Sequence, residues 1–156
     1  LISTGSGAEW STTRVLLENG FTTVLGTDYE GLFAMLMKGR FKSFGRGLNE
    51  ITPEYNNHID KFPELAIEAG HALYIPLPTY FFVSPKKPKK PKLAKRIEQG
   101  LLELIKDGSF DEIFDQYHAE LIESSSLRSR TVFKVDNPNL SDLDPLDKPE
   151  FWLSLD

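Results

Sequence analysis

Apolar positions in the first third of the chain alternate between helical spacing and short β-branched segments. A Gly-containing turn at residues 5–7 leads into an expected helix over residues 10–18, which an Asn-Gly pair ends. Residues 22–25 read as a strand, residues 27–39 as a helix with a capping box and an apolar face, and residues 41–44 as another strand. This order predicts an α/β unit with a parallel sheet.

The middle of the chain predicts one short helix and then extended segments. The helix covers residues 52–59, with Thr as the N-cap and Pro at the first helical position. Residues 65–67, 71–75 and 79–83 are apolar or aromatic segments separated by Gly and Pro. We expect consecutive strands or a hinge-like extended chain here.

Helical spacing returns in the last third. One amphipathic helix is expected from Leu93 to an Asp-Gly stop at residues 107–108, and a second, with Ser109 and Glu112 as a capping box, continues to about Ile122. Both apolar faces need a surface to cover. The remainder is rich in Ser, Asp and Pro and is expected to wrap over the outside.

Composition narrows the class of protein. The chain has 156 residues, 40% of them hydrophobic and 26% charged, which suits a soluble domain with a core. It has no cysteine, so disulfides and thiolate metal sites are excluded. A net charge of -5 argues against a general nucleic-acid binder. The Lys-rich run over residues 86–96, broken by prolines, predicts a stiff solvated loop, with an acidic surface or lipid headgroups as alternative contacts.

Gly5-Ser6-Gly7 is the first candidate site. Free N–H groups at a helix N-terminus, with a Ser hydroxyl beside them, suit an anionic group. The motif is neither a phosphate-binding loop nor a dinucleotide fingerprint, and the local sequence favours a plain turn with a helix cap over an anion site.

Arg46 is the second candidate, because it lies between two glycines at the end of an expected strand, in the segment 44–50 that also holds Asn49 and Glu50. An Arg fork can grip a carboxylate in two places, although an exposed Arg in a tight turn is the alternative. Trp10 offers either a flat wall to a ligand or a core side chain.

The sequence predicts no metal ion, cofactor or catalytic residue. The histidines His58, His71 and His118 lack metal-ligand spacing, and neither a Ser/His/Asp pattern nor a nucleophile elbow is present. We therefore expect a binding protein and not an enzyme.

The order of motifs resembles family 3 extracellular solute-binding proteins, which have the type 2 periplasmic binding fold. The matching segments are Tyr80-Phe81-Phe82-Val83-Ser84-Pro85, residues 93–101 and residues 106–117, with residues 9–21, 29–41 and 44–50 upstream. The upstream segments look like the second lobe of an uncharacterised branch of that family.

The resemblance implies a three-layer α/β lobe over residues 1–78, a return crossing strand and two first-lobe helices over residues 79–123, and an extended tail over residues 124–156. The main body of the first lobe, and a signal peptide, are expected to lie outside the chain. Since both helices would then lack their partner, we expect self-association, with a swapped dimer as one form.

For function, the resemblance implies capture of a small polar solute in a cleft between lobes, in the periplasm, for delivery to a membrane permease of an ABC transporter. The solute is expected to be an amino acid or another carboxylate-bearing metabolite. It would contact Gly5, Ser6, Gly7, Trp10, Arg46, Asn49 and Glu50. The alternatives are a dehydratase or murein-cleaving enzyme on the same scaffold, with Glu50 as the nearest acid or base, and a sensor domain of a signalling receptor.

Overall fold

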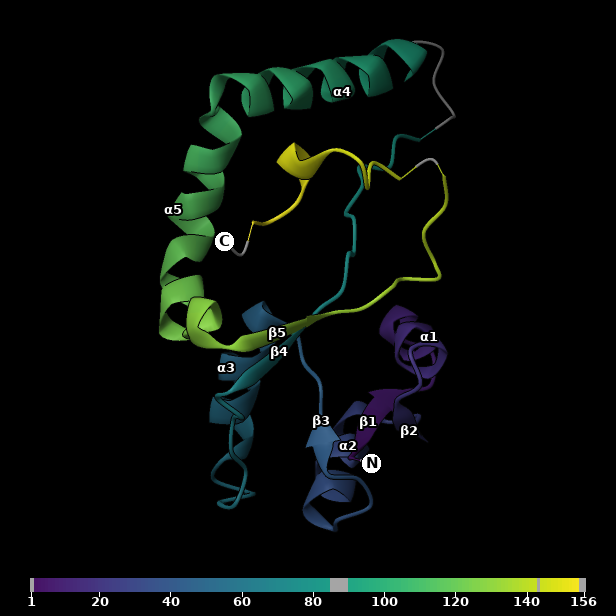
Figure 1. Ribbon diagram of the computed structural model, residues 1–156, viewed down its shortest axis with the longest axis vertical. Coiled ribbons are helices and arrows are strands. Elements are labelled where there is room, and N and C mark those ends of the chain that lie inside the picture. Colours follow the sequence, from purple (N-terminus) through teal and green to yellow (C-terminus); the bar gives the residue numbers. More distant parts are fainter. Residues whose placement is uncertain (1, 85–89, 143, 155–156) are drawn as a thin grey trace.

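A computed structural model describes residues 2–84, 90–142 and 144–154 (Figure 1). The chain has an α/β fold with two small parallel sheets. The elements, with η for 3-10 helices, are β1 (Ser3–Gly7), α1 (Ser11–Glu18), β2 (Thr22–Gly26), α2 (Tyr29–Met37), β3 (Ser43–Phe44), α3 (Leu48–His58), β4 (His71–Tyr74), α4 (Lys90–Asp107), α5 (Ser109–Ser124), η1 (Leu127–Ser129), β5 (Thr131–Lys134) and η2 (Pro149–Phe151).

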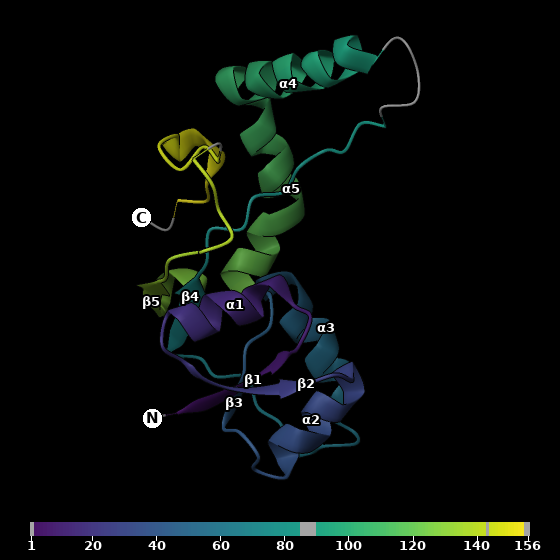
Figure 2. The same ribbon diagram turned by 90° about the vertical axis from the view of Figure 1, so that its right-hand side faces the viewer.

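The first sheet has the strand order β2-β1-β3, with all pairs parallel. The chain moves from β1 to one side of the sheet and then crosses back past β1 to β3. Because crossovers between parallel strands are right-handed, these opposite moves place α1 and α2 on opposite faces. Figure 2 shows α1 above the sheet and α2 below it. The predicted α/β unit with a parallel sheet is confirmed.

The ends of α1 and α2 follow from local chemistry. The Asp28 side chain caps α2 by accepting a hydrogen bond of 2.7 Å from the backbone N–H of Gly31. Gly20 and Gly39 follow the two helices with φ of 77° and 67°, a left-handed conformation that favours glycine. Both helices therefore lie where the sequence predicts them, except that the N-cap of α2 is Asp28 and not Thr27.

The core lies between the first sheet and its helices. Its buried apolar side chains, each at most 8% exposed, are Val15, Leu16, Leu32, Phe33 and Phe41. Phe41 and Leu32 are each 1% exposed, and they are among the largest fully buried side chains. These residues belong to α1, α2 and the segment before β3, so the α/β unit has a hydrophobic core of its own.

The helix α3 begins earlier than predicted. It starts at Leu48, with Gly47 as N-cap, and Pro53 lies inside it instead of at its first position. The Glu50 carboxylate stabilises this earlier start by accepting a hydrogen bond of 3.0 Å from the backbone N–H of Gly47. The expectation that Thr52 caps the helix is therefore wrong.

A second sheet joins distant parts of the chain. β4 and β5 pair in parallel, with His71 opposite Thr131 and Tyr74 opposite Lys134. The predicted strand over residues 71–75 is thus confirmed, whereas residues 65–67 and 79–83 form no strand. Residues 124–156, expected as an extended tail, contain β5 and two 3-10 helices.

The tail after β5 packs against α1. The side-chain amide of Asn19 donates to the carbonyl of Asp136 at 2.7 Å and accepts from the N–H of the same residue at 3.2 Å. Asn139 donates to the carbonyl of Ser11 at 3.0 Å. These bonds hold residues 136–139 against α1.

The helices α4 and α5 project away from the first sheet (Figure 1). Gly108, with φ of 84°, separates them, and Ser109 is the first helical residue of α5 instead of its predicted cap. No residue of α5 is buried. Among the described residues, no helix combines the length and the apolar character needed to cross a bilayer. Residues 85–89, which hold the first part of the Lys-rich run, lie outside the described residues.

Candidate functional site

Two loops meet at the carboxyl ends of β1 and β3. Residues 8–10 follow β1 and lead to α1, and residues 45–47 follow β3 and lead to α3. β1 and β3 are neighbours in the sheet, although β2 lies between them in the sequence. Ligands of open α/β sheets bind outside the carboxyl ends of the strands, where the strand order reverses. This edge of the sheet is therefore the candidate location of a ligand site.

Arg46 is held there by two carboxylates. Its Nε and Nη2 atoms each donate a hydrogen bond of 2.6 Å to one oxygen of Glu54. Nη2 also lies 3.1 Å from Oε2 of Glu50. The paired bonds to Glu54 match the planar fork of the guanidinium. With a side chain only 14% exposed, Arg46 is a fixed group and not a solvated one.

Three aromatic rings surround the Arg46 guanidinium. Its central carbon lies 4.7 Å from the ring centroid of Trp10 and 5.5 Å from those of Tyr29 and Phe44. Trp10 and Phe44 are nearly parallel, with centroids 6.0 Å apart. A cation over an aromatic face is stabilised by about 0.5–2 kcal/mol. The rings and Glu54 together fix the direction of the guanidinium.

The protonation states follow from these contacts. Burial, together with hydrogen bonding to Glu54, raises the pKa of Tyr29 to about 12. Burial acts to raise the pKa of Glu54 as well, but hydrogen bonds from Arg46 and Tyr29 outweigh it and leave that pKa below its usual range. The hydrogen bond to Glu54 raises the pKa of Arg46. At neutral pH the group is therefore a neutral phenol beside an ionised Arg–Glu pair.

Gly5, Ser6 and Gly7 lie in β1 and not in a turn at a helix N-terminus, which corrects the prediction. Ser6 is 1% exposed, and its hydroxyl lies 2.6 Å from that of Thr13 in α1. Thr13 in turn donates to the carbonyl of Gly7 at 2.6 Å. The motif fails as an anion site in this form, because Ser6 is buried under α1 and α1 begins only at Ser11.

The two glycines have a packing role. A Cβ atom on Gly5 would lie 2.3 Å from the Phe41 ring, and one on Gly7 would lie 2.4 Å from the Trp10 ring. Neither distance is possible without a shift of the ring. Gly5 and Gly7 therefore let two aromatic rings approach the strand, and Gly7 helps to position Trp10 beside Arg46.

Asn49 and Glu50 lie in the first turn of α3 instead of the expected loop. Both are exposed. Glu50 lies beside Arg46, whereas the side-chain oxygen of Asn49 lies near Gly47, where it would be 2.9 Å from an added Cβ atom. The structure thus brings together Trp10, Arg46 and Glu50 among the predicted site residues, with Asn49 at the edge.

The sequence analysis missed Glu54, Tyr29 and His58. His58 is 6% exposed, stacks on Phe33 with centroids 3.8 Å apart, and lies 3.1 Å from a carboxylate oxygen of Glu30. Its Nδ1 contacts the carbonyl of Glu54 at 2.7 Å, so it supports the turn that carries Glu54. Residues 46, 50 and 54 are each four positions apart. Side chains at this spacing lie on one face of a helical turn, so the spacing could have indicated that Glu50 and Glu54 lie beside Arg46.

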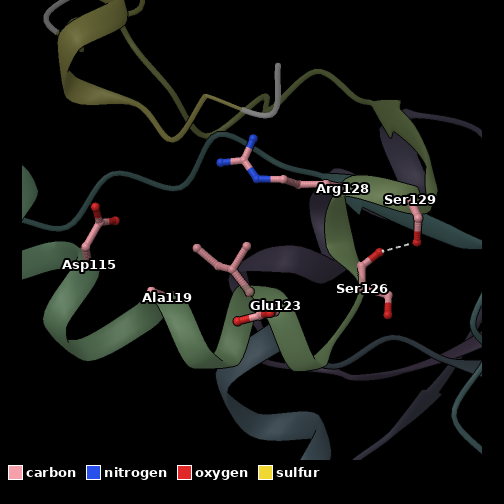
Figure 3. Close-up of a pocket in the computed structure, with 7 residues that line it drawn as sticks. Asp115, Ala119, Glu123, Ser126, Arg128 and Ser129 are labelled. Carbon is pink, nitrogen blue, oxygen red and sulfur yellow. Dashed lines mark hydrogen bonds between the residues drawn. The ribbon is translucent and has the colours of Figure 1, made fainter.

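A separate hollow of about 400 Å³ lies between α5 and η1 (Figure 3). Figure 3 shows Asp115, Ala119 and Glu123 along α5, with Arg128 on the opposite side. Its polar lining residues are exposed and carry charges of both signs. Charged groups that are exposed to solvent interact only weakly with a ligand. This hollow is therefore a poorer candidate for a ligand site than the Arg46 cluster.

The histidines do not form a metal site in the described part of the chain. His58 belongs to α3, His71 to β4 and His118 to α5. No group of three or more His, Asp or Glu residues that could hold a metal ion is found in residues 2–84, 90–142 and 144–154.

Comparisons of the chain with protein-family models, with curated proteins and with solved structures found no match.

Proposed function

We propose that the chain binds a small polar solute at the carboxyl ends of β1 and β3, as one lobe of a periplasmic solute-binding protein that delivers its solute to a membrane transporter. The observation that carries this proposal is the fixed Arg46, enclosed by Trp10, Tyr29 and Phe44 and anchored by Glu54. A guanidinium that is already oriented loses little entropy when a ligand binds.

The arrangement of the two sheets also supports the proposal. From β4 the chain continues without regular structure over residues 75–84 and leads to α4 and α5, and it returns through β5 beside β4. Two strands thus connect the α/β unit to a second group of helices. A solute held between two such parts would favour their closure, which is a common mechanism of binding proteins.

The test is a panel of amino acids, organic acids and sugars, measured by thermal shift and calorimetry. We expect a carboxylate-bearing solute to raise the melting temperature. Arg46→Lys keeps the charge but removes the fork, and should weaken binding by about tenfold. Arg46→Ala should abolish it.

Arg40→Ala is the matched control, since Arg40 is an exposed arginine that follows α2 in the same unit. Circular dichroism must show that each variant remains folded, because Arg46→Ala leaves Glu54 without its partner. If no compound of the panel shifts the melting temperature, or if Arg40→Ala weakens binding as much as Arg46→Lys, the proposed function is wrong.

A further inference from the structure

The two carboxylates on Arg46 differ in how firmly they are held. Glu54 makes two bonds of 2.6 Å, and its side chain is 15% exposed. Glu50 makes one contact of 3.1 Å with Arg46, and its side chain is 45% exposed. Glu54 is therefore a permanent anchor, while Glu50 is in a position to exchange with another anion.

The guanidinium keeps a free edge on the Glu50 side. Arginine has five N–H donors; the one on Nε and one on Nη2 serve Glu54, and the other on Nη2 faces Glu50. Among the described residues, none accepts a hydrogen bond from Nη1. A carboxylate that approached along the edge of Nη1 and Nη2 could accept two bonds where Glu50 accepts one.

A single oxygen of Glu50 marks the place of the incoming group. Its Oε2 lies 3.0 Å from the backbone nitrogen of Gly47 and 3.1 Å from Nη2 of Arg46. An external carboxylate oxygen at this point would accept from both donors, at the first turn of α3, where the helix dipole also favours negative charge.

We infer that Glu50 is an internal substitute for the ligand, and that the solute carries a carboxylate which displaces Glu50 from Arg46 and the Gly47 N–H. This inference rests on the proposed function and adds a specificity-determining residue. Glu50 lowers the affinity for carboxylates, because a ligand must first expel a group of the same charge. When the site is empty, Glu50 occupies the position beside Nη2 that Glu54 does not fill.

The experiment compares the wild type with Glu50→Gln, using acetate and benzoate as probes and acetamide and benzamide as neutral counterparts. The glutamine oxygen can still accept from the Gly47 N–H, so the helix start is retained. Binding is followed by NMR, through the guanidinium protons of Arg46 and the indole N–H of Trp10. We expect Glu50→Gln to bind acetate and benzoate about 2- to 5-fold more tightly than the wild type, and neither amide to bind.

Glu18→Gln is the control for charge alone, since it removes an exposed carboxylate at the opposite end of α1 from Trp10. It should leave the affinity unchanged. If the Glu50→Gln variant binds carboxylates no more tightly than the wild type or the Glu18→Gln variant, the inference is wrong while the proposed function stands. The inference is also wrong, and the proposed function still stands, if the solutes of the broad panel that bind in an Arg46-dependent way are all neutral or cationic. If nothing in the panel and neither carboxylate binds, both proposals are wrong.

Discussion

The α/β unit of residues 3–58 and the pair of helices α4 and α5 come from similar amphipathic patterns, yet they end in different environments. The first region contains Val15, Leu16, Leu32, Phe33 and Phe41 as a buried core. In the second, α5 buries no residue, and Leu93, Leu102 and Ile113 are each exposed by 45% or more. An amphipathic pattern specifies a helix and its apolar face, but it does not supply the surface that covers that face.

The largest expected effect is on the core of the α/β unit. Phe41→Ala removes a ring that is 1% exposed and leaves a cavity over Gly5. We expect a loss of about 3–5 kcal/mol in the free energy of unfolding, measured by urea denaturation followed by circular dichroism. Phe82→Ala is the control, because Phe82 is 98% exposed, and it should change stability by less than about 0.5 kcal/mol. Equal losses in the two variants would contradict the assignment of Phe41 to a buried core.

A methyl group added to β1 tests how closely this core is packed. A Cβ on Gly5 would meet the Phe41 ring at 2.3 Å, so Gly5→Ala should destabilise the unit by about 1–3 kcal/mol. At Gly45 an added Cβ has no heavy atom within 4 Å, and Gly45→Ala should leave stability nearly unchanged. The same denaturation measurement checks both. A Gly5→Ala protein as stable as the Gly45→Ala protein would mean that the ring moves aside freely.

The charged cluster around Arg46 should add a pH dependence to the stability of the α/β unit. Glu54 has a pKa below its usual range, so its contribution to stability is present above the unfolded pKa and is lost as the pH falls through the folded one. Tyr29, with a pKa of about 12, loses its contribution as the pH rises from about 10 to 12.

Absorbance titration of tyrosinate checks the alkaline limb, since Tyr29→Phe should remove the component near pH 12. Glu54→Gln should flatten the fall in stability below about pH 4.5. A wild-type protein in which all tyrosines titrate together near pH 10 would contradict the arrangement around Arg46.

Substitutions on α4 and α5 should have the smallest effect on stability. Their expected effect is on the oligomeric state of the protein. We propose that two copies associate through these helices, because α5 carries Asp and Glu but no Lys or Arg, while the start of α4 is basic. Ile113→Glu should shift the protein toward monomer in sedimentation, with less than about 0.5 kcal/mol lost in the unfolding of the α/β unit. A wild-type protein that is monomeric at high concentration would contradict the proposal that two copies associate through α4 and α5.

The contrast also explains which parts could be predicted from the sequence. The helices α1 and α2 have local stop signals, Gly20 and Gly39, so their positions depend on neighbours in the chain. The start of α3 was misplaced because Pro53 resembles a first helical residue, whereas the Glu50 side chain and the Gly47 N–H decide the start.

The site was partly predictable for the same reason. The position of Arg46 after a strand indicates a candidate site residue. Its partner Glu54 could not be identified in the same way, because the predicted start of α3 was too late in the sequence. The strand β5 depends on pairing with β4, which places Thr131 opposite His71, and the segment after β5 is held to α1 by the bond between Asn19 and Asp136. Such contacts join residues far apart in the sequence, and no local pattern predicts them.

The pairing of β4 with β5 also bears on the order in which the chain folds. Residues 75–130, with both α4 and α5, lie between the two strands, so β4 must wait for nearly the whole chain before it finds its neighbour. Closing a long loop is slow compared with forming the local contacts of the α/β unit. During synthesis, residues 3–58 can therefore fold first. The β4–β5 ladder then forms as a late step, which pulsed hydrogen exchange would detect as delayed protection of β4 and β5 relative to β1 and β2.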